Sequence, residues 1–364
     1  MRNMNTVALT LILVFALTGC GQARKLPLSW GHPQIIYVFA SDEVWAEAEI
    51  DLHRMLARDI YTTQNEQWFK LKRADMEHFE DYFRFDNLLF LGSLDSENAV
   101  TEFMQESLGA DVEEQVKRLG EGVYSKNDQW AKGQIAVFFL SETQQNLTEF
   151  NHRQSAKLFD TFRQQFYDRL RTHVYLYNTY DADVFFADWP WTLDLPDNYV
   201  IYKQNLADNF ACYFLQVGDA PERYLAVWFE QTARPADMKA WMKQARNYIG
   251  AEYFAGEKIL PTQSPRLRKN RFAEQDAWQM NGHWINDETI TGGAFQSWGF
   301  YDDDTGRAYL VDTSVFYPEG KKLPPLVELE LIARTFRLKQ EADAYETTPD
   351  DSAAAGGDTA AVGL

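Results

Sequence analysis

The sequence has little cysteine, a deficit of basic residues, and no apolar run long enough to cross a bilayer. Two cysteines in 364 residues exclude a scaffold held together by disulfides. Lys and Arg number 35 against 54 Asp and Glu, so the net charge is −19 and nucleic acid would be repelled over most of the surface. We therefore expect no nucleic acid partner.

The motifs of well-known catalytic and metal sites are also missing. The six histidines form no H-E-x-x-H pair and have no cysteine partner, and there is no G-x-S-x-G, Walker or Rossmann motif. The only local acid–base grouping is His283 with Asp287 and Glu288, and the sequence identifies no groups that would position it for catalysis. We expect no metal and no cofactor, and the catalytic residues of any activity stay unknown.

The chain is rich in apolar side chains. Hydrophobic residues make up 45% of the sequence and aromatic residues 15%, which is enough to bury a sizeable core. The length accommodates two domains.

The N-terminus carries a specific signal. Val7–Leu17 is an apolar run of eleven residues interrupted only by Thr10, which is the length of a secretory hydrophobic region. The tetrapeptide that ends at Cys20 resembles a bacterial lipobox. This resemblance implies a signal peptide over 1–19, acyl chains on Cys20 and membrane attachment through those chains. Gly21 follows the anchor, which favours an outer-membrane lipoprotein that faces the periplasm. Cys212, in an apolar run, is predicted to be buried and inert.

The pattern beyond the anchor predicts an α+β protein with two sandwich-like α/β domains, whose sheets are mixed or antiparallel with helices packed on them. The predicted order is a tether (20–33), an N-terminal α/β domain (34–171), a linker (172–192), a C-terminal α+β domain (193–338) and a disordered acidic tail (339–364). The first domain is expected to carry its helices on one face. Whether the two halves are a duplication stays open.

Within the C-terminal domain we expect three meander strands, a helix, a hairpin over 294–317 and a final helix. Residues 255–276 are locally basic and are predicted to be loop.

Three patches carry a family resemblance, namely Asp128-Gln-Trp130-Ala131 with Gln134, Trp284 with Gly292-Gly293-Ala294-Phe295, and Tyr317-Pro318 with Lys321-Lys322. They resemble an uncharacterised lipoprotein family of Bacteroidetes-type bacteria, domain-of-unknown-function family 4837. The resemblance would cover nearly the whole mature chain. It implies a lipid-anchored envelope protein and supplies no activity.

A candidate binding surface is formed by Trp284, Gly292, Gly293 and Trp298, because exposed aromatic rings stack on sugars or anchor protein partners. The alternative is that the tryptophans fill the core and the glycine pair permits a close backbone approach.

We therefore expect a non-enzymatic binding or scaffold component of the cell envelope, with an envelope protein or a glycan as its partner. The alternative is an envelope hydrolase that acts on glycan or peptide through carboxylates the sequence does not identify. A deep pocket with converging carboxylates or histidine would favour the enzyme, and a flat aromatic patch would favour the binding module.

Overall fold

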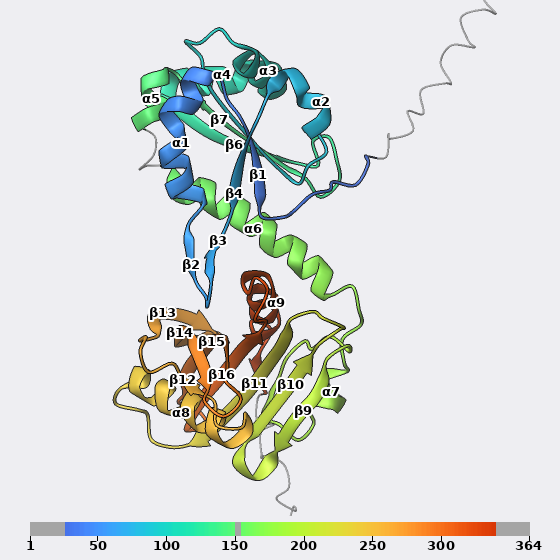
Figure 1. The fold of residues 1–364 in the computed structure, drawn as a ribbon, viewed down its shortest axis with the longest axis vertical. Helices are drawn as coiled ribbons and strands as arrows, with labels where there is room; N and C mark the ends of the chain where they lie inside the picture. The colour runs from blue at the N-terminus through green and yellow to red at the C-terminus, as the bar shows by residue number, and fades with distance from the viewer. Residues whose placement is uncertain (1–25, 150–153, 340–364) are drawn as a thin grey trace, which may run out of the picture.

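The computed structural model describes residues 26–149 and 154–339. They form two units, here called the N-terminal and C-terminal domains, and each has one central sheet between helices (Figure 1). The α+β class with two layered domains is thus confirmed. The proposed signal peptide and Cys20 lie outside the described residues, as does the acidic tail from residue 340 onward.

The N-terminal sheet is mixed and has the order β4-β1-β5-β7-β6. Its strands are β1 (Ile35–Phe39), β4 (Lys70–Ala74), β5 (Asn87–Ser93), β6 (Glu121–Asn127) and β7 (Ile135–Ser141). The first four strands in the sheet order run parallel and β6 is antiparallel at the edge. Every residue of β5 and β7 is buried, as the continuous apolar runs of parallel strands covered on both faces require.

Helices cover both faces of this sheet. One face packs against α1 (Asp42–Leu56), α5 (Gln144–Glu149) and α6 (Ser155–Val174). The other packs against the short η1 (Met76–His78) and α2 (Phe79–Tyr82), α3 (Ala99–Leu108) and α4 (Ala110–Leu119).

The prediction of helices on one face only is therefore wrong for this domain. The physical reason lies in the strands, because Phe39, Phe90 and Phe138 all project to the second face. Their rings stack at centroid distances of 4.8 and 5.0 Å and need a cover against water.

The C-terminal sheet has eight strands, and all of its neighbouring strands are antiparallel. Its order is β12-β14-β15-β16-β11-β10-β9, with β13 also paired to β14. The strands are β9 (Val200–Asn205), β10 (Phe210–Leu215), β11 (Glu222–Gln231), β12 (Lys258–Ile259), β13 (Arg266–Phe272), β14 (Gln275–Asn286), β15 (Thr291–Asp302) and β16 (Arg307–Phe316). A one-turn η3 (Leu206–Asp208) joins β9 to β10. Helix α8 (Met238–Tyr253) packs on one face and α9 (Leu323–Ala333) on the other.

The predicted hairpin is confirmed and consists of β15 and β16. These strands pair from Asp302 opposite Arg307, next to the turn, to Ala294 opposite Val315. The loop predicted over 255–276 is wrong, since this segment holds β12 and β13. Most residues of β13 are exposed and charged, so the composition of this segment is not typical of a strand. The segment forms a strand because its backbone pairs with β14.

The segment 172–192, predicted as a linker, has defined structure. It holds the end of α6, the short α7 (Ala182–Phe185) and β8 (Trp191–Thr192), which pairs with β17 (Arg337–Leu338). Trp189 and Trp191 are buried in the core of the C-terminal domain. Their rings stack at a centroid distance of 5.5 Å.

A hairpin of the N-terminal domain, β2 (Asp59–Tyr61) and β3 (Asn65–Gln67), reaches the C-terminal domain (Figure 1). The buried Glu66 carboxylate accepts hydrogen bonds from the backbone N–H groups of Lys322 at 2.8 Å and Leu323 at 3.0 Å. Helix α9 has no capping side chain of its own. The hairpin therefore supplies the N-cap of a helix in the other domain, which joins the two domains through a charge-assisted contact.

Candidate functional site

The structure buries both tryptophans of the predicted binding surface. Trp298 is 0% exposed and Trp284 is 4% exposed. The Trp298 ring stacks on Phe272 at a centroid distance of 5.1 Å, so it fills the core beneath α9. The expectation that these rings form an exposed aromatic patch is not met, because both side chains are needed to cover a wide, thin sheet. Trp284 and Trp298 are core residues, as the alternative interpretation expected.

The glycine pair lies within β15 and is explained by a close approach. A Cβ atom on Gly293 would lie 2.2 Å from the carbonyl oxygen of Val315 and 2.6 Å from Nε1 of Trp284. Gly292 and Trp284 also border a smaller cavity of about 670 Å³ beside the tip of the β2–β3 hairpin. The pair thus serves packing between strands, as the alternative interpretation expected.

The acid–base grouping around His283 is not assembled by the fold. The Nδ1 atom of His283 lies 2.7 Å from Oε1 of Gln263, and burial lowers the pKa of the imidazole. Asp287 forms an ion pair with Lys258 instead. The backbone N–H of Glu288 donates to the side chain of Asn286, which makes this segment a polar turn.

Cys212 is fully buried in β10, as predicted. Burial raises the pKa of its thiol well above the usual range, which suppresses the reactive thiolate. Cys20, the predicted lipid attachment residue, lies outside the described residues.

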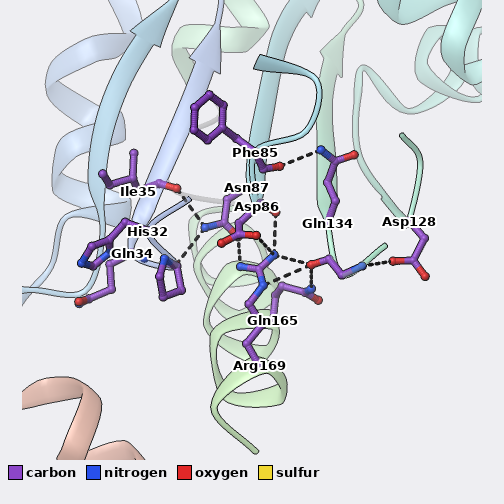
Figure 2. A network of polar contacts seen from close by, with 12 residues as sticks. His32, Gln34, Ile35, Phe85, Asp86, Asn87, Asp128, Gln134, Gln165 and Arg169 are labelled. Carbon is purple, nitrogen blue, oxygen red and sulfur yellow. Dashed lines mark hydrogen bonds and ion pairs between the residues drawn. The ribbon is translucent and has the colours of Figure 1, made fainter. Parts of the chain in front are cut away.

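The Asp128–Gln134 patch builds a polar network at the amino ends of the parallel strands (Figure 2). The side-chain amide of Gln134 donates to the carbonyl groups of Phe83 at 2.6 Å and Phe85 at 2.7 Å. Arg169 of α6 donates to the carbonyl groups of Asp86 at 2.8 Å and Gly133 at 2.6 Å. It also donates to the side chain of Asn87 at 2.9 Å.

Each donor of this network meets an acceptor of the protein. Asn87 itself donates to the carbonyl groups of Pro33 and Ile35, so three strands are joined to α6. A network satisfied in this way holds the fold together and leaves little hydrogen-bonding capacity for a ligand.

A cavity between the two domains is called here the interdomain cleft. Its volume is about 1230 Å³, above the roughly 300–1,000 Å³ usual for small-molecule sites. The base of the β2–β3 hairpin and α6 form one wall, and β13, β15 and α9 form the other. Figure 1 shows α6 running from the N-terminal domain toward α9.

Six arginines line the interdomain cleft, three from each domain. They are Arg58, Arg163 and Arg171 on the N-terminal wall and Arg266, Arg268 and Arg334 on the C-terminal wall. Four carboxylates line it as well, namely Asp59, Asp160, Asp194 and Glu330. The cleft therefore has more positive than negative side chains in a chain whose net charge is −19.

Three of these carboxylates are held by arginines. Asp160 pairs with Arg163 at 3.0 Å, and Glu330 pairs with Arg334 at 2.7 Å. Asp194 pairs with Arg337, which lies outside the cleft lining.

Two arginines on opposite walls have a different environment. Arg58 and Arg268 have no carboxylate within ion-pair distance among the described residues. The Arg58 guanidinium lies 3.9 Å from the centroid of the Phe159 ring, and its Nε donates to the carbonyl group of Met55. Nε of Arg268 donates to the side-chain oxygen of Gln279 at 2.8 Å.

Half-buried aromatic rings also line the cleft on the N-terminal wall. Trp68 and Tyr167 stack at a centroid distance of 6.2 Å with an interplanar angle of 19°. The Tyr167 hydroxyl donates to Oε2 of Glu330 at 3.0 Å, and this contact ties α6 to α9 at the base of the cleft. Burial and the Glu330 carboxylate both raise the pKa of Tyr167, so the hydroxyl stays protonated.

Sequence reasoning missed the interdomain cleft. The basic stretch around Arg266 and Arg268 was the one visible signal, since the other arginines lie in separate elements.

Two absences apply to residues 26–149 and 154–339. No group of three or more His, Cys, Asp or Glu side chains there is placed to hold a metal ion. No helix there combines the length and apolar character needed to cross a membrane.

Three of the solved structures that resemble this chain are distant in sequence and in fold. A crystal structure from Bacteroides thetaiotaomicron VPI-5482 is 9% identical with a TM-score of 0.28, covering 43% of this chain and 47% of that chain. The Ran-binding protein Mog1p of Saccharomyces cerevisiae is 10% identical with a TM-score of 0.30, covering 41% and 90%. The PsbP protein of Synechocystis sp. PCC 6803 is 9% identical with a TM-score of 0.29, covering 42% and 88%. This chain therefore spans less than half of the first of these structures.

No curated protein matches the sequence. Two family models match separate parts of the chain, and both describe domains of unknown function. DUF8532 matches residues 29–175 and DUF4837 matches residues 182–335. The expectation that one family would cover nearly the whole mature chain is corrected, since the Asp128–Gln134 patch falls within the first model. The C-terminal domain of this protein, over residues 182–335, belongs to the DUF4837 domain family.

Proposed function

We propose that this protein is a lipid-anchored component of the cell envelope that binds a ligand in the interdomain cleft without transforming it. The apolar run and Cys20 support the anchor, with the body on the periplasmic side of the outer membrane. The observation that carries the binding role is the cleft itself, a cavity of about 1230 Å³ whose two walls come from different domains.

The arrangement favours binding over hydrolysis. Of the four cleft carboxylates, Asp160, Asp194 and Glu330 form ion pairs with arginines. An arginine paired with a carboxylate occupies the oxygens through which a general acid or a nucleophile would have to contact a substrate. The envelope hydrolase stays the alternative, and turnover of a captured ligand would favour it.

Replacing Cys20 with alanine is expected to move the protein from the membrane fraction to the soluble fraction, because no acyl chain can then be attached. The measurement is fractionation together with metabolic acyl labelling. Cys212→Ala is the matched control, since it removes the other cysteine and is expected to keep label and membrane association. Label that survives in Cys20→Ala would refute the anchor.

Filling the interdomain cleft is expected to abolish ligand capture. Gln164→Trp places a large ring in the cleft from the exposed side of α6. The measurement is cross-linking in intact envelopes, followed by mass spectrometry of the adducts on tagged protein. Gln105→Trp is the control, because Gln105 lies on α3 away from the cleft. Equal adduct yields from both variants and the wild type would place the binding site elsewhere.

A further inference from the structure

We infer that the ligand of the interdomain cleft is an extended acidic oligosaccharide, a sugar chain that carries carboxylate or phosphate groups. This inference rests on the proposed function and names the chemical class of the ligand for that binding site. It is carried by the charge, the length and the aromatic lining of the cleft.

The charge of the cleft favours an anion. Three arginines from each domain face one cavity, and Arg58 and Arg268 have no carboxylate partner among the described residues. A planar guanidinium donates paired hydrogen bonds to carboxylate or phosphate oxygens. Since these two arginines lie on opposite walls, an anionic ligand between them would contact both domains at once.

The spread of the arginines favours an extended ligand. Arg163 and Arg171 are eight residues apart on α6, which is about 12 Å along a helix. Arg266 and Arg268 are two residues apart on β13 and both line the cleft, as strand periodicity allows. One compact anion cannot reach all of these groups, whereas a chain with several anionic groups can.

The aromatic lining favours sugar. Trp68 and Tyr167 are both half-buried, so part of each ring faces the cleft. Aromatic rings of this kind pack against the apolar faces of sugar rings while their polar atoms keep hydrogen-bond partners.

The test uses the full mature chain and three probes, tri-galacturonate, neutral galactotriose and linear tripolyphosphate, with calorimetry and tryptophan fluorescence as readouts. Tri-galacturonate is expected to bind most tightly, and Arg58→Gln with Arg268→Gln is expected to weaken it by about tenfold per arginine. The matched control is Arg54→Gln with Arg271→Gln. It removes the same charge from α1 and β13 outside the cleft lining and is expected to leave affinity unchanged. Circular dichroism checks that both variants fold.

The outcomes separate this inference from the function beneath it. Galactotriose that binds as tightly as tri-galacturonate, with no effect of the arginine variants, would overturn the acidic character and leave the cleft as a binding site. Tripolyphosphate that binds where tri-galacturonate does not would overturn the oligosaccharide class. Failure of all three probes would overturn the inference, and loss of adducts in Gln164→Trp would still uphold the proposed function.

Discussion

Replacing Arg246 with methionine is expected to lower the free energy of unfolding by about 3–5 kcal/mol. Arg246 of α8 is 0% exposed. Its guanidinium lies 3.1 Å from the Glu257 carboxylate and 3.0 Å from that of Asp312. Methionine fills much of the volume but leaves the buried Asp312 and the half-buried Glu257 carboxylates without a cation. Urea denaturation of the wild type and the variant at neutral pH measures the difference.

The pH dependence of this loss follows from the buried acids. Burial raises the pKa of Glu257 to about 6 from its usual 4.5, although Arg246 opposes that shift. Burial also raises the pKa of Asp312. The folded state therefore binds the Glu257 proton more tightly than the unfolded state, so this contribution to stability is present below about pH 4.5 and is lost as pH rises through about 6. Without Arg246 the pKa of both carboxyl groups is expected to rise further, because the opposing cation is gone. The loss of stability in the variant should therefore be smaller at pH 5 than at pH 7.5.

A triple variant provides the control for buried charge. Arg246→Met with Glu257→Gln and Asp312→Asn removes the acids together with the cation and is expected to recover much of the loss. Equal losses in the single and triple variants would show that packing, not unpaired charge, causes the destabilisation.

Replacing Arg169 with alanine is expected to cost about 3–5 kcal/mol of stability. Its guanidinium donates to two carbonyl groups and to Asn87, at the amino ends of strands β5 and β7 (Figure 2). Alanine removes these hydrogen bonds and leaves the largely buried Asp86 carboxylate without the arginine that lies 3.8 Å away. Arg169→Lys should recover only part of the stability lost in the alanine variant, because an ammonium group cannot donate the paired hydrogen bonds of a planar guanidinium. Chemical denaturation measures all of these differences.

Arg171→Ala is the matched control on the same helix. Its ion pair with Asp168 is about half exposed, so the expected loss is at most about 0.5 kcal/mol. Equal losses in the two alanine variants would contradict a special role for the network around Arg169.

Some elements could be predicted because their cause is local. The apolar runs that became β5 and β7 and the turn between β15 and β16 carry their signals within a few residues. Strand β13 could not be predicted in this way, because its charged residues are stabilised as strand only by pairing with β14. Trp284 and Trp298 were assigned to a surface because no local sequence pattern reveals whether a tryptophan side chain is buried against the sheet or exposed.

The sequence by itself determined the α+β class, the membership of the C-terminal domain in its family, the burial of Cys212 and the absence of familiar catalytic motifs. Only the tertiary structure decided that Glu66 caps a helix of the other domain and that six arginines share one cleft. The physical reason is that hydrophobic periodicity and turn chemistry act between near neighbours in the chain. Caps between domains, buried ion pairs and clefts depend on residues that only folding brings together.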